Sequence, residues 1–313
     1  MLRIIEKRKY AYVFSAILLT ISVVALFTWG LNLGIDFKGG TLMEVQFIET
    51  ENILEEESAF QAPSREEVQN KLASLEIDSL TVQLSENNSI LLKYIASNED
   101  LNEDVVAKLN EFDGDLKQLR VDFIGASVSN QLKKSTAWAL ISAVIGIALY
   151  IAWAFRKVSF PIPSWQYGLG AILALTHDII ITLGIFSILG EFFNVEVGIP
   201  FIAALLTILG YSVNDTIVVY DRVRENILKS DSRENFENIT NRSLNETLAR
   251  SINTSLTVIV VLLAIILFGG ATIKFFAMAL LIGVLFGTYS SIFVASALLV
   301  SSYKYKLNRL DSE

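Results

Sequence analysis

Six apolar segments, each about as long as the hydrocarbon core of a bilayer requires, constrain this sequence more than any other feature. They lie at about residues 12–31, 136–155, 168–189, 197–219, 252–268 and 275–300. In lipid such a run forms a helix, because a helix satisfies its own backbone polar groups. Hydrophobic residues make up 52% of the 313 residues, which is too many for an ordinary soluble domain. We therefore expect a polytopic α-helical membrane protein with six transmembrane helices.

A hydrophilic insert, 36–134, separates the first two apolar segments. It carries 20 acidic and 9 basic residues, a net −11, whereas the rest carries 13 and 16, a net +3, which together give the chain's −8. The sequence has no basic patch that would suggest a nucleic-acid partner. It has no cysteine for a disulfide or a thiolate metal site, and no nucleotide-binding motif. We expect no enzyme activity and no cofactor, so energy would come from an ion gradient or a partner.

The insert has the pattern of a small α/β domain. Strand patterns at 41–49, 80–84, 90–95 and 116–124 alternate with helix patterns at 64–74 and 98–112. Ser64 and Glu67 form a capping box at the first helix. The order βαββαβ predicts a ferredoxin-like antiparallel sheet covered by two helices. We expect the acidic linker 49–62 to be irregular, with a turn at 86–88 between the middle strands.

Basic residues predict the orientation. They gather at the N-terminus, after the second apolar segment, in the polar, helix-prone loop 221–250 and at the C-terminus, whereas the opposite short loops hold only Lys274. Residues 1–35 would then form a cytoplasmic N-terminus and a first, uncleaved transmembrane helix. Residues 36–134 would form an extracytoplasmic domain. Residues 135–313 would form a five-helix bundle with a cytoplasmic loop and C-terminus.

The fourth apolar segment runs into GYSVNDTIVVYDRVREN, which places Asn214 and Asp215 where lipid is expected. A carboxylate there costs about 2.5–3.5 kcal/mol on insertion scales, so such a group is by default a functional hypothesis. The alternative is a carboxylate paired for packing, or one that reaches interfacial water. Asn214 has no titrating group and is expected to hydrogen-bond between helices.

Two further positions suggest proton chemistry. Arg250, just before the fifth segment, is either an ordinary basic anchor or an alternating partner of Asp215. His177, the single histidine, and Asp178 lie together in the third segment. They form either a proton relay or a helix end that reaches interfacial water.

The sixth segment carries small residues at a spacing of four, which is typical of close helix packing. The stripe is either a tight interface or a sliding surface, and it comprises Ala279, Gly283, Gly287, Ser291 and Ala295.

Several motifs resemble the SecD/SecF family of export proteins, over nearly the whole chain. GIDFKGGT, with Asp36, Gly39 and Gly40, resembles the family's Gly-Gly signature. HDIIITLGIFSI, GYSVNDTIVVYDRVREN and SLNETLARSINTSLTVIVVLLAIILFGG resemble the third-, fourth- and fifth-span motifs of its SecF branch. The insert is the least similar part.

The resemblance implies a six-span subunit of the bacterial inner (plasma) membrane, related to resistance-nodulation-division transporters. It implies pairing with SecD, here supplied in trans, and association with the SecYEG channel and YajC. Protons would drive preprotein release after the motor SecA has acted. The family's proton-linked aspartate corresponds to Asp215, and its arginine before the fifth span to Arg250.

Two other functions remain open: half of a proton-driven small-molecule or lipid exporter, and a passive scaffold. Related exporters typically carry larger outside domains than this insert, which favours the export subunit. A scaffold would tolerate Asp215→Asn.

Overall fold

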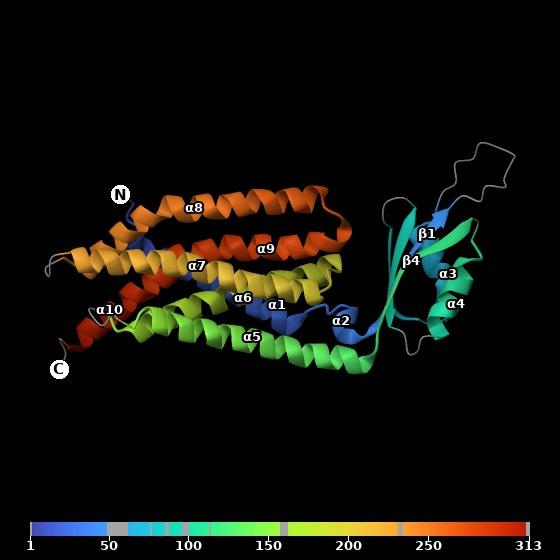
Figure 1. Cartoon of the computed structure of the whole chain (residues 1–313), viewed down its shortest axis with the longest axis horizontal. Coiled ribbons are helices and arrows are strands. Elements are labelled where there is room, and N and C mark those ends of the chain that lie inside the picture. Colours follow the sequence, from blue (N-terminus) through green and yellow to red (C-terminus); the bar gives the residue numbers. More distant parts are fainter. Residues whose placement is uncertain are drawn as a thin grey trace. The chain divides into compact units, whose positions relative to one another are not determined.

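The computed structural model describes residues 2–48, 62–75, 77–84, 88–95, 100–112, 114–156, 162–230 and 234–310 (Figure 1). The chain divides into two compact units. The helical unit comprises Met1–Asn32 and Ala137–Glu313, and the α/β unit comprises Leu33–Thr136. The expected linker at 49–62, apart from Ala62, and the turn residues 86 and 87 lie outside the described residues.

Six helices in the described part of the chain are long and apolar enough to cross a membrane, as predicted. The first combines a short 3-10 turn, Ile5–Lys7, with α1, Arg8–Thr28. The next four are α5 (Ala126–Ala154), α6 (Ser164–Phe193), α7 (Ile199–Lys229) and α8 (Phe236–Phe268). The sixth joins α9 (Ala271–Ser290) to α10 (Ser296–Leu310) through a π-helical segment, Ser291–Ala295.

Helices α6, α7 and α9 form the centre of the helical unit, with α1 packed on α6 and α8 packed on α9 and α7 (Figure 1). Half of the most apolar part of α6 is buried within the chain, whereas only 6% of that of α5 is. Since α5 leaves most of its apolar surface uncovered, lipid or another chain has to cover it.

Small residues bring α9 close to α7. A Cβ atom at Gly287 would lie 3.0 Å from Cβ of Ser212 on α7, and one at Gly283 would overlap the side chain of Ile208. Ala279, Ser291 and Ala295 are fully buried. The stripe of small residues therefore lies at a tight helix–helix interface.

The connecting segment 221–250, expected to be helix-prone, is mostly helix. α7 continues to Lys229 and α8 begins at Phe236, with the side chain of Asn235 accepting a hydrogen bond from the Glu237 amide. Ion pairs link the two extensions, for example Arg222 to Glu246 at 2.6 Å. The polar, helix-prone composition of this segment thus extends both helices beyond their apolar runs.

Residues before α1 are fixed by asparagines of α8. Asn241 Oδ1 accepts from the Ile4 amide at 2.9 Å, and Asn245 Oδ1 accepts from the Leu2 amide at 2.7 Å. Glu237 binds Arg8 at 2.5 Å and also pairs with Lys304 of α10. The start of α8 thereby holds the N-terminal segment and α10 at one end of the unit (Figure 1).

The α/β unit has the predicted ferredoxin-like order. Its elements are β1 (Gly40–Ile48), α3 (Arg65–Leu72), β2 (Asp78–Leu84), β3 (Ser89–Ile95), α4 (Asp100–Leu109) and β4 (Asp115–Ile124). The four strands are antiparallel in the order β2-β3-β1-β4. Met43, Val45 and Phe47 alternate along β1 and pack with Val68 of α3 and Val105 of α4 in a fully buried core.

Local signals account for much of this unit. Ser64 and Glu67 form the expected capping box: the Glu67 amide donates to Ser64 Oγ at 3.3 Å, and the Ser64 amide to Glu67 Oε2 at 2.7 Å. Tyr94 donates to Asn102 at 2.7 Å, and burial raises the pKa of its hydroxyl to about 12.

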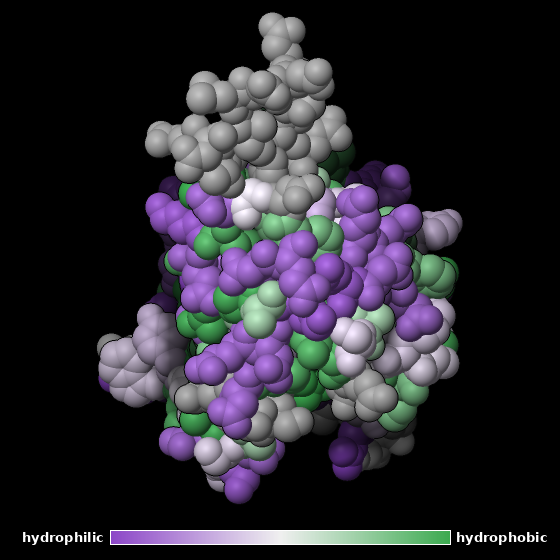
Figure 2. Space-filling view, turned by 90° about the vertical axis from the view of Figure 1, so that its right-hand side faces the viewer, coloured by the Kyte–Doolittle hydropathy of each residue, from purple (hydrophilic) through white to green (hydrophobic). Residues whose placement is uncertain are grey.

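The surface of the α/β unit is largely polar. Figure 2, which looks onto this unit, shows mostly hydrophilic side chains with smaller hydrophobic areas between them.

The two adjacent glycines connect α2 (Ile35–Lys38) to β1. Gly39 has φ +84° and Gly40 has φ +134°, values that L side chains rarely adopt. A Cβ atom at Gly40 would overlap the Tyr94 carbonyl, and one at Gly39 would lie 3.2 Å from the Ile124 carbonyl oxygen. The Gly-Gly pair thus serves the close approach of β1 to both neighbouring strands.

We predict that Gly40→Ala destabilises the α/β unit by about 2 kcal/mol or more, since it adds backbone strain to a steric overlap. Hydrogen exchange on the full-length protein should show lost protection in β1 and β3. Gly125→Ala is the matched control, because its Cβ would meet only the Phe123 ring at 3.9 Å. Equal protection in both variants would contradict the prediction.

Candidate functional site

Two carboxylates lie inside the helical unit, on the facing central helices α6 and α7. Asp178 of α6 is fully buried, and Asp215, near the middle of α7, is 9% exposed. A charged or polar group in such surroundings is costly unless it is hydrogen-bonded or neutralised. The partners of each carboxylate therefore decide what it can do.

Asp178 has hydrogen-bond partners on three helices. Its Oδ2 accepts from Ser212 Oγ of α7 and from Ser290 Oγ of α9, each at 2.7 Å. Its Oδ1 lies 2.9 Å from Nδ1 of the neighbouring His177. Both carboxylate oxygens thus have partners, and the carboxylate links α6, α7 and α9.

His177 is also buried, at 4% exposed. Its ring stacks on Tyr289, with centroids 6.1 Å apart, and its Nε2 has no hydrogen-bond partner among the described residues. His177 and Asp178 lie in the middle of α6. The alternative that they form a helix end reaching interfacial water is therefore wrong. One nitrogen of the imidazole remains available for a proton or a further partner.

Asp215 is less completely satisfied than Asp178. Its Oδ1 accepts from Ser251 Oγ of α8 at 2.5 Å. Its Oδ2 is buried and has no partner within the described residues. A buried acceptor without a partner costs about 1–3 kcal/mol, so this oxygen is suited to take up a proton or to meet a group from outside the chain.

The two carboxylates are linked through α7. Ser212, which donates to Asp178, precedes Asp215 by three residues, about 4.5 Å of helix rise. Other hydroxyls continue across the neighbouring helices: Thr216 lies 2.8 Å from Ser291 of the π-helical segment, and Ser255 of α8 lies 2.5 Å from Thr288 of α9. The interfaces around Asp215 are therefore polar as well as tight.

Arg250 is exposed and forms no ion pair within the described residues. The residue that contacts Asp215 is its neighbour Ser251. Arg250 instead lines a cleft of about 600 Å³ between the C-terminal part of α7 and the N-terminal half of α8, together with Asp221, Arg222, Arg224, Glu225 and Glu246. In this structure, then, the arginine is close in sequence to the partner of Asp215 but is not itself that partner.

Asn214 lies on the exposed side of α7. No hydrogen bond involves its side chain in the part of the chain that the structure describes, so the expected bond between helices of this chain is not found. The reason is the helical period: Ser212, Thr216 and Val219 lie on the buried face of α7, and Asn214 lies on the opposite side of the helix from Ser212. Asp36, Gly39 and Gly40 belong to the α/β unit, where Asp36 is half-buried in α2.

Sequence reasoning missed the hydroxyl partners, above all Ser212, Ser251 and Ser290. Each is an ordinary serine in a membrane helix, and which carboxylate it meets depends on helix packing. A signal existed in hindsight: Ser212 and Thr216 accompany Asp215 on one face of α7, and Ser251 and Ser255 repeat at a spacing of four on α8.

The described residues contain no group of three His, Cys, Asp or Glu side chains that could hold a metal ion. The polar groups of the site are two carboxylates, one imidazole and several hydroxyls. Chemically it can hold protons, exchange them and shift hydrogen bonds between helices.

Comparison with known proteins identifies the family. Residues 104–305 match the profile described as protein export membrane protein SecD/SecF, C-terminal, and residues 24–47 match the SecD/SecF GG motif. The chain belongs to the SecD/SecF family. Together with its six apolar helices, this makes it a multi-pass membrane protein.

Relatives in this family are similar over nearly their full length. A protein translocase subunit SecF from Thermobaculum terrenum is 42% identical over 301 residues, which is 96% of this chain and 94% of the relative. One from Haemophilus influenzae is 37% identical over 294 residues, 93% of this chain and 83% of the relative.

Solved structures agree with this assignment. The crystal structure of SecDF, a translocon-associated membrane protein from Thermus thermophilus, matches 96% of this chain with a TM-score of 0.78 and 31% identity. SecDF in its super-membrane-facing form matches 99% with a TM-score of 0.67 and 29% identity. This SecD/SecF-family chain spans only 38% and 40% of those two chains.

We predict that Asp178→Ala lowers the free energy of unfolding by about 2–4 kcal/mol, because it leaves two buried serine hydroxyls and the imidazole without their shared acceptor. Thermal unfolding of the full-length protein in detergent measures this. Glu191→Ala, at an exposed carboxylate on the same helix, is the control and should change little. If both variants unfold alike, Asp178 does not hold the three helices together.

Proposed function

We propose that this chain is an accessory subunit of a Sec protein translocase that, together with SecD, uses the proton motive force to promote preprotein translocation and release. The observation that carries the proposal is Asp215: a buried carboxylate with one unpartnered oxygen, in the core of a SecD/SecF-family helical bundle. The names of the relatives, protein translocase subunit SecF, support the translocase part.

The proton step follows from the contacts of Asp215. When the carboxylate is charged, it needs donors at both oxygens, and among the described residues only Ser251 donates to it. When it is protonated, the charge is removed and the neutral carboxyl can itself donate a hydrogen bond. Because Ser251 lies on α8, each proton exchange alters the interaction of α7 with α8.

The membrane potential can drive such a change. Moving one charge through the field is worth about 2.3 kcal/mol per 100 mV, enough to shift a two-state equilibrium about fiftyfold. In this scheme Arg250, one residue before Ser251, approaches Asp215 in its charged state and leaves it when protonated. His177 and Asp178 would anchor the helices that move and exchange protons with the same hydroxyl network.

The orientation in the proposal follows the basic residues. The N-terminal segment, the α7–α8 connection and α10 lie at the same end of the helical unit and carry most of its Lys and Arg (Figure 1). By the positive-inside rule this end faces the cytoplasm of a bacterial inner membrane. The α/β unit is then extracytoplasmic, where it would move with the proton cycle and meet the emerging preprotein.

The proposed partners are SecD, the SecYEG channel and YajC. SecD has direct support, because the matched SecDF chains are more than twice as long as this one. The exposed side of α7 fits a helix of such a partner. It presents small and polar residues at helical spacing, namely Ala203, Thr207, Gly210 and Asn214.

We predict that Asp215→Asn abolishes the gradient-dependent part of preprotein export while leaving assembly intact. Asn keeps the size and the contact with Ser251 but cannot exchange a proton. Export into energised inverted vesicles should fall to the level measured for wild type with a protonophore. Glu191→Gln, an exposed carboxylate on α6, is the control and should export as wild type.

If Asp215→Asn assembles with its partners and exports normally, the carboxylate is structural and the chain is a passive scaffold. Co-purification with a periplasmic adaptor or lipid cargo, in place of export subunits, would support an exporter instead.

We predict that Gly210→Leu weakens co-purification with SecD while the chain itself still folds. A Cβ atom at Gly210 would have no neighbour within 4 Å among the described residues, so a leucine there would protrude into a partner helix packed on this face. Gly146→Leu on α5, equally open in this chain, is the matched control for a bulky side chain on an uncovered face. Retained SecD in Gly210→Leu would place the interface elsewhere.

A further inference from the structure

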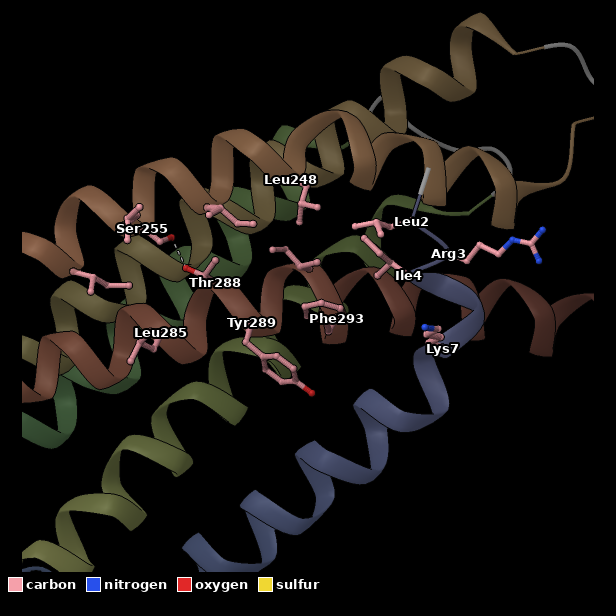
Figure 3. Close-up of a pocket in the computed structure, with 14 residues that line it drawn as sticks. Leu2, Arg3, Ile4, Lys7, Leu248, Ser255, Leu285, Thr288, Tyr289 and Phe293 are labelled. Atoms are coloured by element: carbon pink, nitrogen blue, oxygen red, sulfur yellow. Dashed lines mark hydrogen bonds between the residues drawn. The ribbon is translucent and has the colours of Figure 1, made fainter.

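An open groove lies between α8 and α9 on the outer side of the helical unit (Figure 3). Its volume is about 550 Å³, within the range of about 300–1,000 Å³ common for ligand sites. Ile252, Leu256 and Leu285 line it and are about half exposed, so the groove opens toward the lipid. From Leu248 to Ile259 it follows α8 for about 16 Å.

The walls of this groove offer few free polar groups. Ser255 and Thr288 bind each other at 2.5 Å, as Figure 3 shows. The Tyr289 hydroxyl is turned toward α1, where it donates to the Ala11 carbonyl at 3.0 Å and lies 3.2 Å from Ser15 Oγ. The groove is therefore an apolar channel suited to a hydrocarbon chain.

One end of the groove is cationic. Arg3 and Lys7 lie there, beside the start of α1, and no acidic side chain lines the groove (Figure 3). Lys7 forms no ion pair within the described residues, and Arg3 has only an exposed contact with Glu6 at 3.4 Å. Exposed pairs of this kind are weak, so both cations can bind an anion.

We propose that this groove binds an anionic phospholipid, with one acyl chain along α8 and α9 and the phosphate group held by Arg3 and Lys7. The match is twofold: an apolar channel open to the bilayer, and two cations where the headgroup layer begins. Arginine suits a phosphate because its planar group can make two parallel hydrogen bonds. The site is fixed to α8 through the Leu2 and Ile4 amides, so a bound lipid would brace α1, α8 and α9 together.

Native mass spectrometry of the full-length protein tests the charge requirement, with phosphatidylglycerol as the probe and phosphatidylcholine for comparison. Arg3→Gln/Lys7→Gln should weaken phosphatidylglycerol binding roughly thirtyfold. Lys9→Gln/Lys306→Gln removes two exposed cations outside the groove and should leave binding unchanged. Equal binding of both lipids to wild type, or equal binding of phosphatidylglycerol to both variants, would overturn the proposal.

The acyl-chain position is tested separately. Leu285→Trp should fill the groove and reduce lipid binding, whereas Leu267→Trp, on an exposed part of α8 outside it, should not. A photoreactive benzoylphenylalanine in place of Leu256 should cross-link to phospholipid in membranes. Cross-linking to a second copy or to another protein would show that the groove is a protein interface and overturn the lipid proposal. Export activity enters none of these measurements, so they stand or fall independently of the proposed function.

Discussion

A carboxylate buried among membrane helices must find hydrogen-bond donors, and in this protein Asp178 finds them on every central helix. Ser212 and Ser290 approach one of its oxygens from α7 and α9, and His177 approaches the other from α6. Lipid offers no competing donors, so these bonds specify which faces of the three helices meet. The glycines of α9 make the arrangement possible, because Gly287 lets the backbone of α9 reach the turn of α7 that carries Ser212.

The same turn of α7 leads to Asp215, and the contrast between the two aspartates is informative. Asp178 has partners at both oxygens, whereas Asp215 has only Ser251 in the part of the chain that the structure describes. In the proposed scheme, protonation removes the charge of Asp215 and with it the need for a second donor, whereas charged Asp178 already has a donor at each oxygen. Ser212, which binds Asp178, precedes Asp215 by about one helical turn, so the proposed switch would combine a polar anchor and a proton acceptor that share one turn of α7.

The membrane helices and the fold of the α/β unit could be predicted from the sequence, because they depend on local signals. Apolar length defined the six helices, strand and helix patterns defined the ferredoxin-like sheet, and the capping box at Ser64 appeared where expected. The helix-prone character of 221–250 is confirmed, but hydropathy did not give the ends of α7 and α8, because it marks where a helix leaves the apolar layer and not where the helix ends. The partners of the carboxylates were missed since they depend on rotation about each helix axis, which also turns Asn214 outward and leaves Arg250 exposed.

The residues on the exposed side of α7 favour the packing of this chain against a second subunit. Asn214, Gly210 and Thr207 form an exposed stripe of small and polar residues on α7, the helix that also carries Asp215. Facing lipid alone, a polar asparagine side chain would remain unsatisfied, and the small residues would pack poorly. Both problems are solved if a helix from another chain packs against α7, as the greater length of the SecDF proteins suggests. In the proposed mechanism, α7 would then carry both Asp215 and the contact with the second subunit, so assembly and activity would be linked through this helix.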